Sequence, residues 1–192
     1  MNPNSLPDLW NRLETWLAAN DPASLQTLQP GATEEEILQT EAFLAVQFPE
    51  EFKASYRIHN GQAKYANDLI YNREFLCLER IRDEWKVWKD LLDSGTFETY
   101  KSEPYGPIRD DWWDAKWIPV TYDGSGNHDC LDLNPAEGGK VGQVIDFWHD
   151  DALRLVKADG FTAWLAKFVE GCENGTYVYS EEYGGVAHID DI

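Results

Sequence analysis

The chain has 192 residues, enough for one generous domain, and we expect a single hydrophobic core. Hydrophobic residues make up 43% and charged residues 27% of the sequence, which is typical of globular proteins and excludes a disordered or fibrous chain. Asp and Glu number 35 against 16 Lys and Arg, and the net charge of −19 repels phosphate backbones and anionic lipid. We therefore expect no nucleic-acid partner and no membrane partner.

Three cysteines, Cys77, Cys130 and Cys172, lie far apart and form no C-x-x-C pair. Their odd number and spacing predict free thiols in a reducing cytoplasm rather than a disulfide framework or a zinc site. The amino terminus lacks the basic and apolar regions of a signal peptide, and no apolar run reaches the roughly 18 residues of a membrane span. We therefore predict a cytoplasmic protein with no metal and no cofactor.

Helices dominate the amino-terminal half of the chain. Apolar residues recur at helical spacing up to Pro22, which is expected to end the first helix. Thr33 and Glu36 form a capping box, which predicts the start of a second helix. Trp85 and Trp88 fall on one apolar face of a later helix, and we expect both in the core. The expected helices cover residues 6–17, 33–48, 49–60 and 81–94.

A strand over 65–78 is expected before the fourth helix, and the Pro-, Gly- and charge-rich segment 96–116 after it is expected to be a long loop. Short alternating runs then predict strands at 117–122, 129–133, 141–148 and 153–157, the last of them in the core. A Gly-rich hairpin joins the first two runs, and Phe161 opens a final helix that ends at the Asn174-Gly175 turn. The predicted fold is α+β, a mostly antiparallel sheet packed against flanking N-terminal and C-terminal helices.

Several local patterns occur in a fixed order between residues 30 and 172, and each is a turn or a helix cap. They are Ala32-Thr33-Glu34-Glu35-Glu36-Ile37, Phe48-Pro49-Glu50-Glu51-Phe52 leading to His59-Asn60-Gly61, Trp117-Ile118-Pro119-Val120 before Asp123-Gly124-Ser125-Gly126-Asn127, Leu131-Asp132-Leu133 with Pro135, Gly142-Gln143-Val144-Ile145 with His149-Asp150, and Phe161. The ordered set resembles the SUKH superfamily, which contains the fungal cell-wall assembly regulators. Residues 79–116 and the polar tail 176–192 depart from the pattern, so we interpret 1–192 as a single SUKH-like domain in which 79–116 is a candidate insertion.

The resemblance implies a non-enzymatic binding protein, because bacterial members resemble immunity proteins that inhibit polymorphic toxin domains, many of them nucleases. A nuclease presents Lys and Arg to phosphate, so an acidic protein complements a basic toxin domain. Solubility explains the same acidity equally well. The alternative function is a regulatory interaction scaffold that resembles the cell-wall assembly regulators. A metal-dependent phosphohydrolase is the second alternative.

Acidic loops and strand faces are expected to form the partner-binding surface. Trp112 and Trp113 stand among three aspartates and are candidate anchors, although loop tryptophans also fold back onto the core. Asp129, Asp132 and Asp146 lie on expected strands, where Asp is disfavoured, so either backbone hydrogen bonds or a basic partner must compensate them. The predicted partner-binding residues are Asp110, Asp111, Trp112, Trp113, Asp114, Asp123, Asn127, Asp129, Asp132, Asp146, His149, Asp150 and Asp151.

The phosphohydrolase alternative depends on His128-Asp129 and His149-Asp150 with His59. Adjacent residues of a strand point to opposite faces, which argues against one ligand set. For His59 we expect a structural role instead, as a cap on the last carbonyls of its helix.

Two further interpretations, a calcium loop and a serine nucleophile, concern the hairpin at 123–127. Asp123, Ser125 and Asn127 match a calcium loop, but His128 stands where that loop needs Gly. Ser125 lacks the G-x-S-x-G elbow of a nucleophile. We therefore expect a hairpin turn and no catalytic residue.

Overall fold

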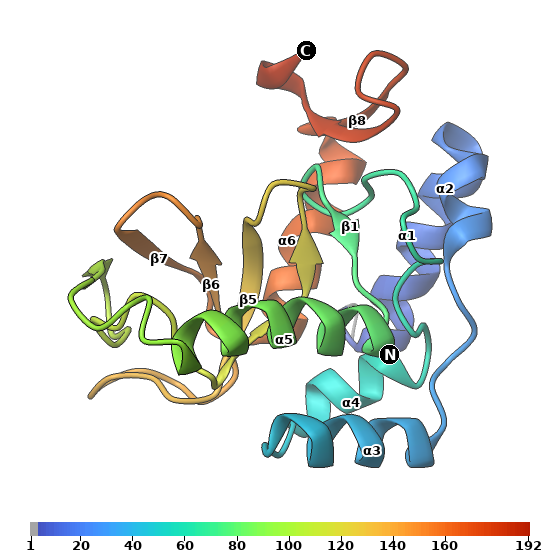
Figure 1. Ribbon diagram of the computed structural model, residues 1–192. Coiled ribbons are helices and arrows are strands. Elements are labelled where there is room, and N and C mark those ends of the chain that lie inside the picture. The colour runs from blue at the N-terminus through green and yellow to red at the C-terminus, as the bar shows by residue number, and fades with distance from the viewer. Residues whose placement is uncertain (1–3) are drawn as a thin grey trace.

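The computed structural model describes residues 4–192 of the chain, which contain both helices and strands (Figure 1). The helices are α1 (Leu6–Asn20), α2 (Pro22–Thr27), α3 (Glu34–Leu44), α4 (Glu50–Tyr56), α5 (Leu78–Asp93) and α6 (Phe161–Asn174), with a 3-10 helix η1 (Ile189–Asp191). The strands are β1 (Glu74–Phe75), β2 (Glu103–Tyr105), β3 (Trp117–Pro119), β4 (Thr121–Tyr122), β5 (His128–Asp132), β6 (Gln143–Phe147), β7 (Leu153–Ala158), β8 (Tyr177–Ser180) and β9 (Gly185–His188). The predicted α+β class is confirmed.

A five-stranded sheet in the order β2-β7-β6-β5-β3 forms the centre of the fold. Every pair in it is antiparallel except β2 with β7, which is parallel. Helix α5 lies on one face and α6 on the other (Figure 1), and adjacent residues of β5 show this directly. His128 accepts a hydrogen bond from Trp88 of α5, whereas Asp129 accepts one from Trp164 of α6. The two faces of the sheet therefore have different environments.

Local signals place most helices as expected. The capping box at Thr33 and Glu36 is present, and Trp85 and Trp88 are buried as predicted. Pro22 does end α1, but it also begins α2, whose first turn is capped by the Asp21 carboxylate at Ser24 N–H. None of the helices within 4–192 is long and apolar enough to cross a membrane.

Three segments differ from the expectation. The strand expected over 65–78 is reduced to the two residues of β1, because Tyr65, Tyr71 and Asn72 have positive φ angles that extended backbone does not allow. The long loop 96–116 contains β2, which pairs with β7 at the edge of the sheet. The polar tail after Gly175, for which no strand was expected, contains the β8–β9 hairpin.

Both edges of the sheet carry a proline. In β2, Glu103 N–H donates to Ala152 O (2.7 Å), so the backbone of Pro104 faces away from β7. In β3, Val120 N–H donates to Asp129 O (2.8 Å), so Pro119 is the residue that faces away from β5. Because proline has no N–H to donate, neither edge offers a full ladder to another strand.

Removing the capping box is expected to weaken α3. Thr33 Oγ1 accepts from Glu36 N–H (3.2 Å), and the Glu36 carboxylate accepts from Thr33 N–H (2.7 Å). Thr33→Ala should lower the free energy of unfolding, measured by urea denaturation, by about 1 kcal/mol. Thr15→Ala, at an exposed mid-helix position of α1, is the matched control and should leave stability nearly unchanged. Equal effects of the two substitutions would contradict the capping role.

Candidate functional site

The loops at one end of the sheet contain most of the predicted partner-binding residues. Strands β5 and β7 begin at this end and β6 finishes there, since His128 pairs with Phe147 and Phe147 pairs with Arg154. The Asn127 side-chain oxygen accepts a hydrogen bond from the backbone N–H of His149 (2.9 Å), which joins the two loops. We call the loops 109–112, 123–127 and 148–151 the acidic end of the sheet.

Arg154 fixes the third of these loops to the first. Its buried guanidinium donates to the backbone oxygens of Asp151 (2.6 Å) and Trp112 (3.0 Å). It also lies over the rings of Phe147 (4.5 Å) and Trp112 (5.3 Å). Burial lowers the pKa of Arg154 to about 10, so the group is still a cation at neutral pH. A buried cation held by carbonyl oxygens thus brings together segments that are about forty residues apart in the sequence.

Charge is distributed unevenly over the acidic end. Lys101 pairs with Asp110 (3.1 Å) and Asp111 (3.7 Å), which partly neutralises the first loop. Burial raises the pKa of Asp123, but hydrogen bonds from Ser125 and Asn127 outweigh it and hold that pKa below its usual value. Those bonds close the hairpin that the sequence predicts at 123–127.

Asp150 and Asp151, in the last of the three loops, are exposed. Neither forms an ion pair with a Lys or Arg of residues 4–192. They are therefore the most available carboxylates of the acidic end.

The two candidate tryptophan anchors have different positions. Trp113 is buried, with its ring centroid 6.3 Å from that of Trp85 and 6.4 Å from that of Trp88, so the prediction of a partner contact is corrected for this residue. Trp112 is half-buried beside Tyr100. The ring of Trp113 thus packs on α5, whereas the ring of Trp112 contacts Tyr100 and the guanidinium of Arg154.

Three polar residues on the predicted surface are also buried: Asn127, Asp129 and Asp132. The Asp132 carboxylate accepts from Gln143 Nε2 (2.8 Å) and from Asn134 N–H (2.9 Å), which compensates it inside the chain. These three side chains are used internally and do not face a partner. Asp114 is half-buried at the opposite end of β5, where Asn134 Nδ2 donates to it (2.6 Å), so it lies outside the acidic end.

Asp129 is at the centre of a buried ionic cluster. Its carboxylate accepts from Arg73 Nη1 (2.7 Å), Lys157 Nζ (2.9 Å) and Trp164 Nε1 (2.8 Å). Arg73 also pairs with Asp146 (3.3 Å). The compensation that a strand aspartate requires is thus supplied by side chains from β7, α6 and the loop before β1, and not by a partner.

An exposed apolar surface next to the acidic end was not predicted from the sequence. Trp148 is 43% exposed, Leu153 44% and Leu155 37%, and they surround a hollow of about 250 Å³ together with Asp146 and Asp151. Tyr105 of β2, which is 78% exposed, lies beside Leu155 in the strand register. We call Tyr105, Trp148, Leu153 and Leu155 the sheet patch.

The sequence pattern misassigned the inward face of β7. Residues 153–157 were expected to be a strand in the core. In the structure Arg154 is buried and the two leucines are exposed. Nothing in the Leu-Arg-Leu alternation reveals this, because a buried arginine depends on carbonyl partners far away in the sequence.

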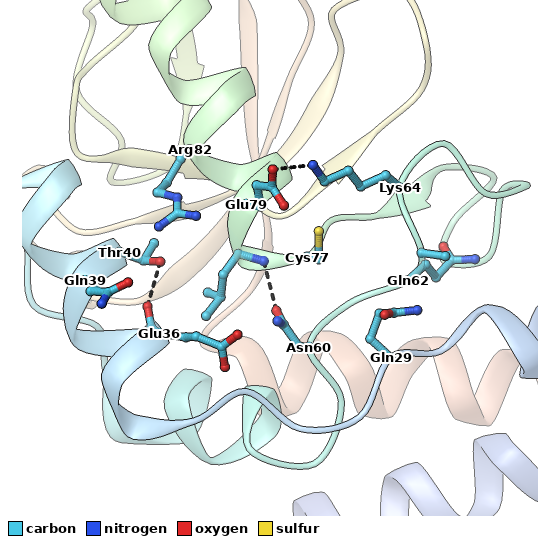
Figure 2. Close-up of a pocket in the computed structure, with 12 residues that line it drawn as sticks. Gln29, Glu36, Gln39, Thr40, Asn60, Gln62, Lys64, Cys77, Glu79 and Arg82 are labelled. Atoms are coloured by element: carbon cyan, nitrogen blue, oxygen red, sulfur yellow. Dashed lines mark hydrogen bonds and ion pairs between the residues drawn. The ribbon is translucent and has the colours of Figure 1, made fainter.

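A second depression, of about 320 Å³, lies between α3, the start of α5 and the loop after α4. Figure 2 shows that its lining is polar: Asn60 caps Leu78 N–H (2.9 Å), and Lys64 pairs with Glu79. Thr40 donates to the backbone oxygen of Glu36 (2.9 Å). None of the predicted site residues lines it. The first two interactions join the loop to α5 and the third lies within α3, and we assign this pocket a structural role.

The histidines of the phosphohydrolase alternative are not brought together. His128 is buried, and His59 binds Gln29 O and the Glu14 carboxylate (both 2.9 Å) instead of capping its own helix, which corrects that prediction. His149 is bound to Asn127. No group of three or more His, Cys, Asp or Glu within residues 4–192 is arranged to hold a metal ion.

Comparison with known proteins gives a consistent result. A family model described as "SMI1 / KNR4 family (SUKH-1)" matches residues 31–167. The chain is 24% identical to "Cell wall assembly regulator SMI1" of Saccharomyces cerevisiae, over 88% of this chain and 40% of that protein. It is 26% identical to "Cell wall biosynthesis/cell cycle regulator smi1" of Schizosaccharomyces pombe, over 94% of this chain and 38% of that protein. It is also 38% identical to "F-box only protein 3" of Homo sapiens, over 88% of this chain and 34% of that protein. The chain thus spans about two fifths of the length of the first two relatives.

Proposed function

The chain belongs to the SMI1/KNR4 family, SUKH-1, and from this membership we propose that it is a regulatory protein that acts by binding a protein partner, without catalysis. The observation that carries the proposal is the family match over residues 31–167, together with relatives whose names describe regulators of the cell wall. The resemblance to the SUKH superfamily is thereby confirmed. Of the two functions that it implied, the regulatory scaffold is the better supported, because no relative described above is named as an immunity protein.

The surface supports a binding role with a basic partner. Asp150 and Asp151 are exposed, and the sheet patch lies beside them. An exposed apolar patch of this kind is typical of a protein interaction site. A partner that carries Lys and Arg complements the net charge of −19. The proposal also places the protein in a reducing cytoplasm, because Cys77, Cys130 and Cys172 are free and buried.

Recovery of the tagged protein from its native cells at low salt tests the proposal. We expect a stoichiometric protein partner with a regulatory or envelope role. Its release should increase with ionic strength, because the Debye length falls from about 10 Å at 0.1 M salt to about 3 Å at 1 M. Binding that does not change with salt would contradict the acidic surface as the site.

Deletion of the gene separates the alternatives. A regulator should give a graded growth or envelope defect in viable cells. Death that is rescued by removing a co-encoded toxin would favour the immunity function. Bound metal and phosphodiesterase turnover in the purified protein would favour the enzyme.

A further inference from the structure

We propose that the sheet patch is the docking surface, and that its occupant is a segment of a protein partner in which an apolar anchor is flanked by Lys or Arg. The inference rests on the proposed function, since it names the surface and the partner chemistry of the same binding activity. It is carried by four features of the described residues: a fixed aromatic ring, an apolar hollow, an excess of free carboxylates and closed strand edges.

Trp148 is held in place before any partner arrives. Its Nε1–H donates to the Asp146 carboxylate (2.8 Å), and the Arg73 guanidinium lies 5.5 Å from the centre of its ring. Arg73 is itself fixed by the buried Asp129 (2.7 Å). An exposed aromatic ring that is already ordered loses little conformational freedom on binding, which favours its use as an anchor point.

The hollow beside this ring is lined by Leu153 and Leu155 of β7 together with Asp146 and Asp151, and β2 lies next to β7. Leu153 and Leu155 are alternate residues of β7, so their side chains point to the same face. The parallel register places Glu103 beside Leu153 and Tyr105 beside Leu155. Helix α6 covers the part of this face that belongs to β5, where Trp164 binds Asp129. It leaves Leu153, Leu155 and Tyr105 exposed. The hollow of about 250 Å³ accepts an apolar side chain of a partner.

The charges around the hollow favour a basic occupant. The nearby cations Arg73 and Lys157 are already paired with Asp129, and Arg73 also with Asp146. Asp151 and Glu103 are exposed, and neither has an ion pair with a Lys or Arg in the described part of the chain. A second copy of this chain would present the same carboxylates to this surface, and like charges repel, whereas flanking Lys or Arg side chains complement them.

The proline in β2 disfavours docking by strand addition. Pro104 stands at the outward position of β2, the edge nearest the sheet patch, and offers no N–H to an added strand. We therefore expect the occupant to be recognised through its side chains, as a helix or a turn that presents one anchor. This separates the proposed mode from β-augmentation, which uses main-chain hydrogen bonds at a free edge.

Fluorescence anisotropy with a labelled synthetic peptide tests the proposal. The peptide has a leucine pair flanked by lysines. Two matched peptides replace either the leucines by serine or the lysines by glutamate. We expect the first peptide to bind the full chain and both others to fail. Leu153→Ser should weaken binding roughly tenfold and Trp148→Ala roughly thirtyfold, because a central aromatic anchor contributes more. Leu38→Ser, at a 61% exposed leucine of α3, is the matched control and should bind as the wild type does.

Several outcomes would overturn the inference. They are failure of the first peptide to bind, equal binding of the serine peptide, equal weakening by Leu38→Ser, and self-association of the chain that Leu153→Ser abolishes. Amide chemical shifts give a second readout, since a docked peptide should perturb residues of β2, β7 and 146–151 first. If a native partner is recovered equally well by Leu153→Ser, Trp148→Ala and wild-type protein, the sheet patch is wrong but the proposed function remains. If no protein partner exists, the proposed function itself fails.

Discussion

Replacing Asp129 by Asn is expected to lower the free energy of unfolding by about 3–5 kcal/mol, a large share of the stability of a typical domain. The substitution keeps the shape of the side chain but removes its charge, which leaves Arg73 and Lys157 without their buried counter-ion. Asp129 is fully buried, so water cannot replace the lost interactions. Urea denaturation monitored by tryptophan fluorescence measures the change.

Asp150→Asn is the matched control, because it removes a carboxylate that is exposed and has no Lys or Arg ion pair within residues 4–192. Its effect should stay within about 0.5 kcal/mol. If Asp129→Asn is as stable as Asp150→Asn, the ionic cluster does not stabilise the fold. Because Arg73 also supports Trp148, Asp129→Asn should in addition weaken peptide binding to the sheet patch in protein that remains folded.

Acidification from pH 6.5 to pH 4 is expected to remove roughly 3 kcal/mol of stability through His128. The imidazole is fully buried, and burial lowers its pKa from 6.5 to about 4. Its Nε2 accepts from Trp88 Nε1–H (3.0 Å), and its Nδ1 must donate to Thr121 O (2.7 Å), since a carbonyl oxygen only accepts. The unfolded chain binds the proton first, so this contribution is complete above pH 6.5 and is lost as the pH falls toward 4.

The titration of Asp68 changes stability in the opposite direction to that of His128. Asp68 must therefore be replaced before the contribution of His128 can be measured. Burial, followed by the charges of Asp123 and Glu74, raises the pKa of the Asp68 carboxyl to about 6. The folded state therefore binds this proton more readily than the unfolded state, and stability rises as the pH falls through 6. The change in stability due to Asp68 is smaller than that due to His128, because the Asp68 carboxyl is only half-buried and is screened by solvent.

The measurement compares urea denaturation of Asp68→Asn with that of Asp68→Asn combined with His128→Gln, between pH 4 and pH 7. Between pH 6.5 and pH 4, Asp68→Asn should lose roughly 3 kcal/mol more stability than the double variant. The other carboxyl groups are common to both proteins and cancel in the difference. Parallel profiles would show that His128 is not kept neutral in the folded state.

Much of the fold was predictable because its signals are local. The capping box of α3, the apolar face of α5, the 123–127 hairpin and the Asn174-Gly175 end of α6 each depend on residues within a few positions of one another. The segments that were not predicted lack such local signals. Strand β2 exists only because β7 lies beside it, and the β8–β9 hairpin has no strong alternation of its own.

The candidate site was predictable only in part. Acidic residues near 110, 123 and 150 were identified from composition, and the structure does bring them to one end of the sheet. Their convergence depends on Arg154 and Asn127, which link loops that are distant in the sequence. The sheet patch was not predicted, because Leu153 and Leu155 resemble core residues in every local respect.

The family, the α+β class, the acidic charge and the positions of the main helices were all predictable from the amino-acid sequence, because composition, capping and periodicity act over short stretches of chain. The burial of chemically identical residues, in contrast, is set by tertiary packing. Asp129 faces Arg73 and α6 whereas Asp150 faces solvent, and Trp113 packs on α5 whereas Trp112 stays half-buried. These differences arise because the burial of a side chain depends on which elements cover its face of the sheet, and on counter-ions and carbonyls that lie tens of residues away along the chain.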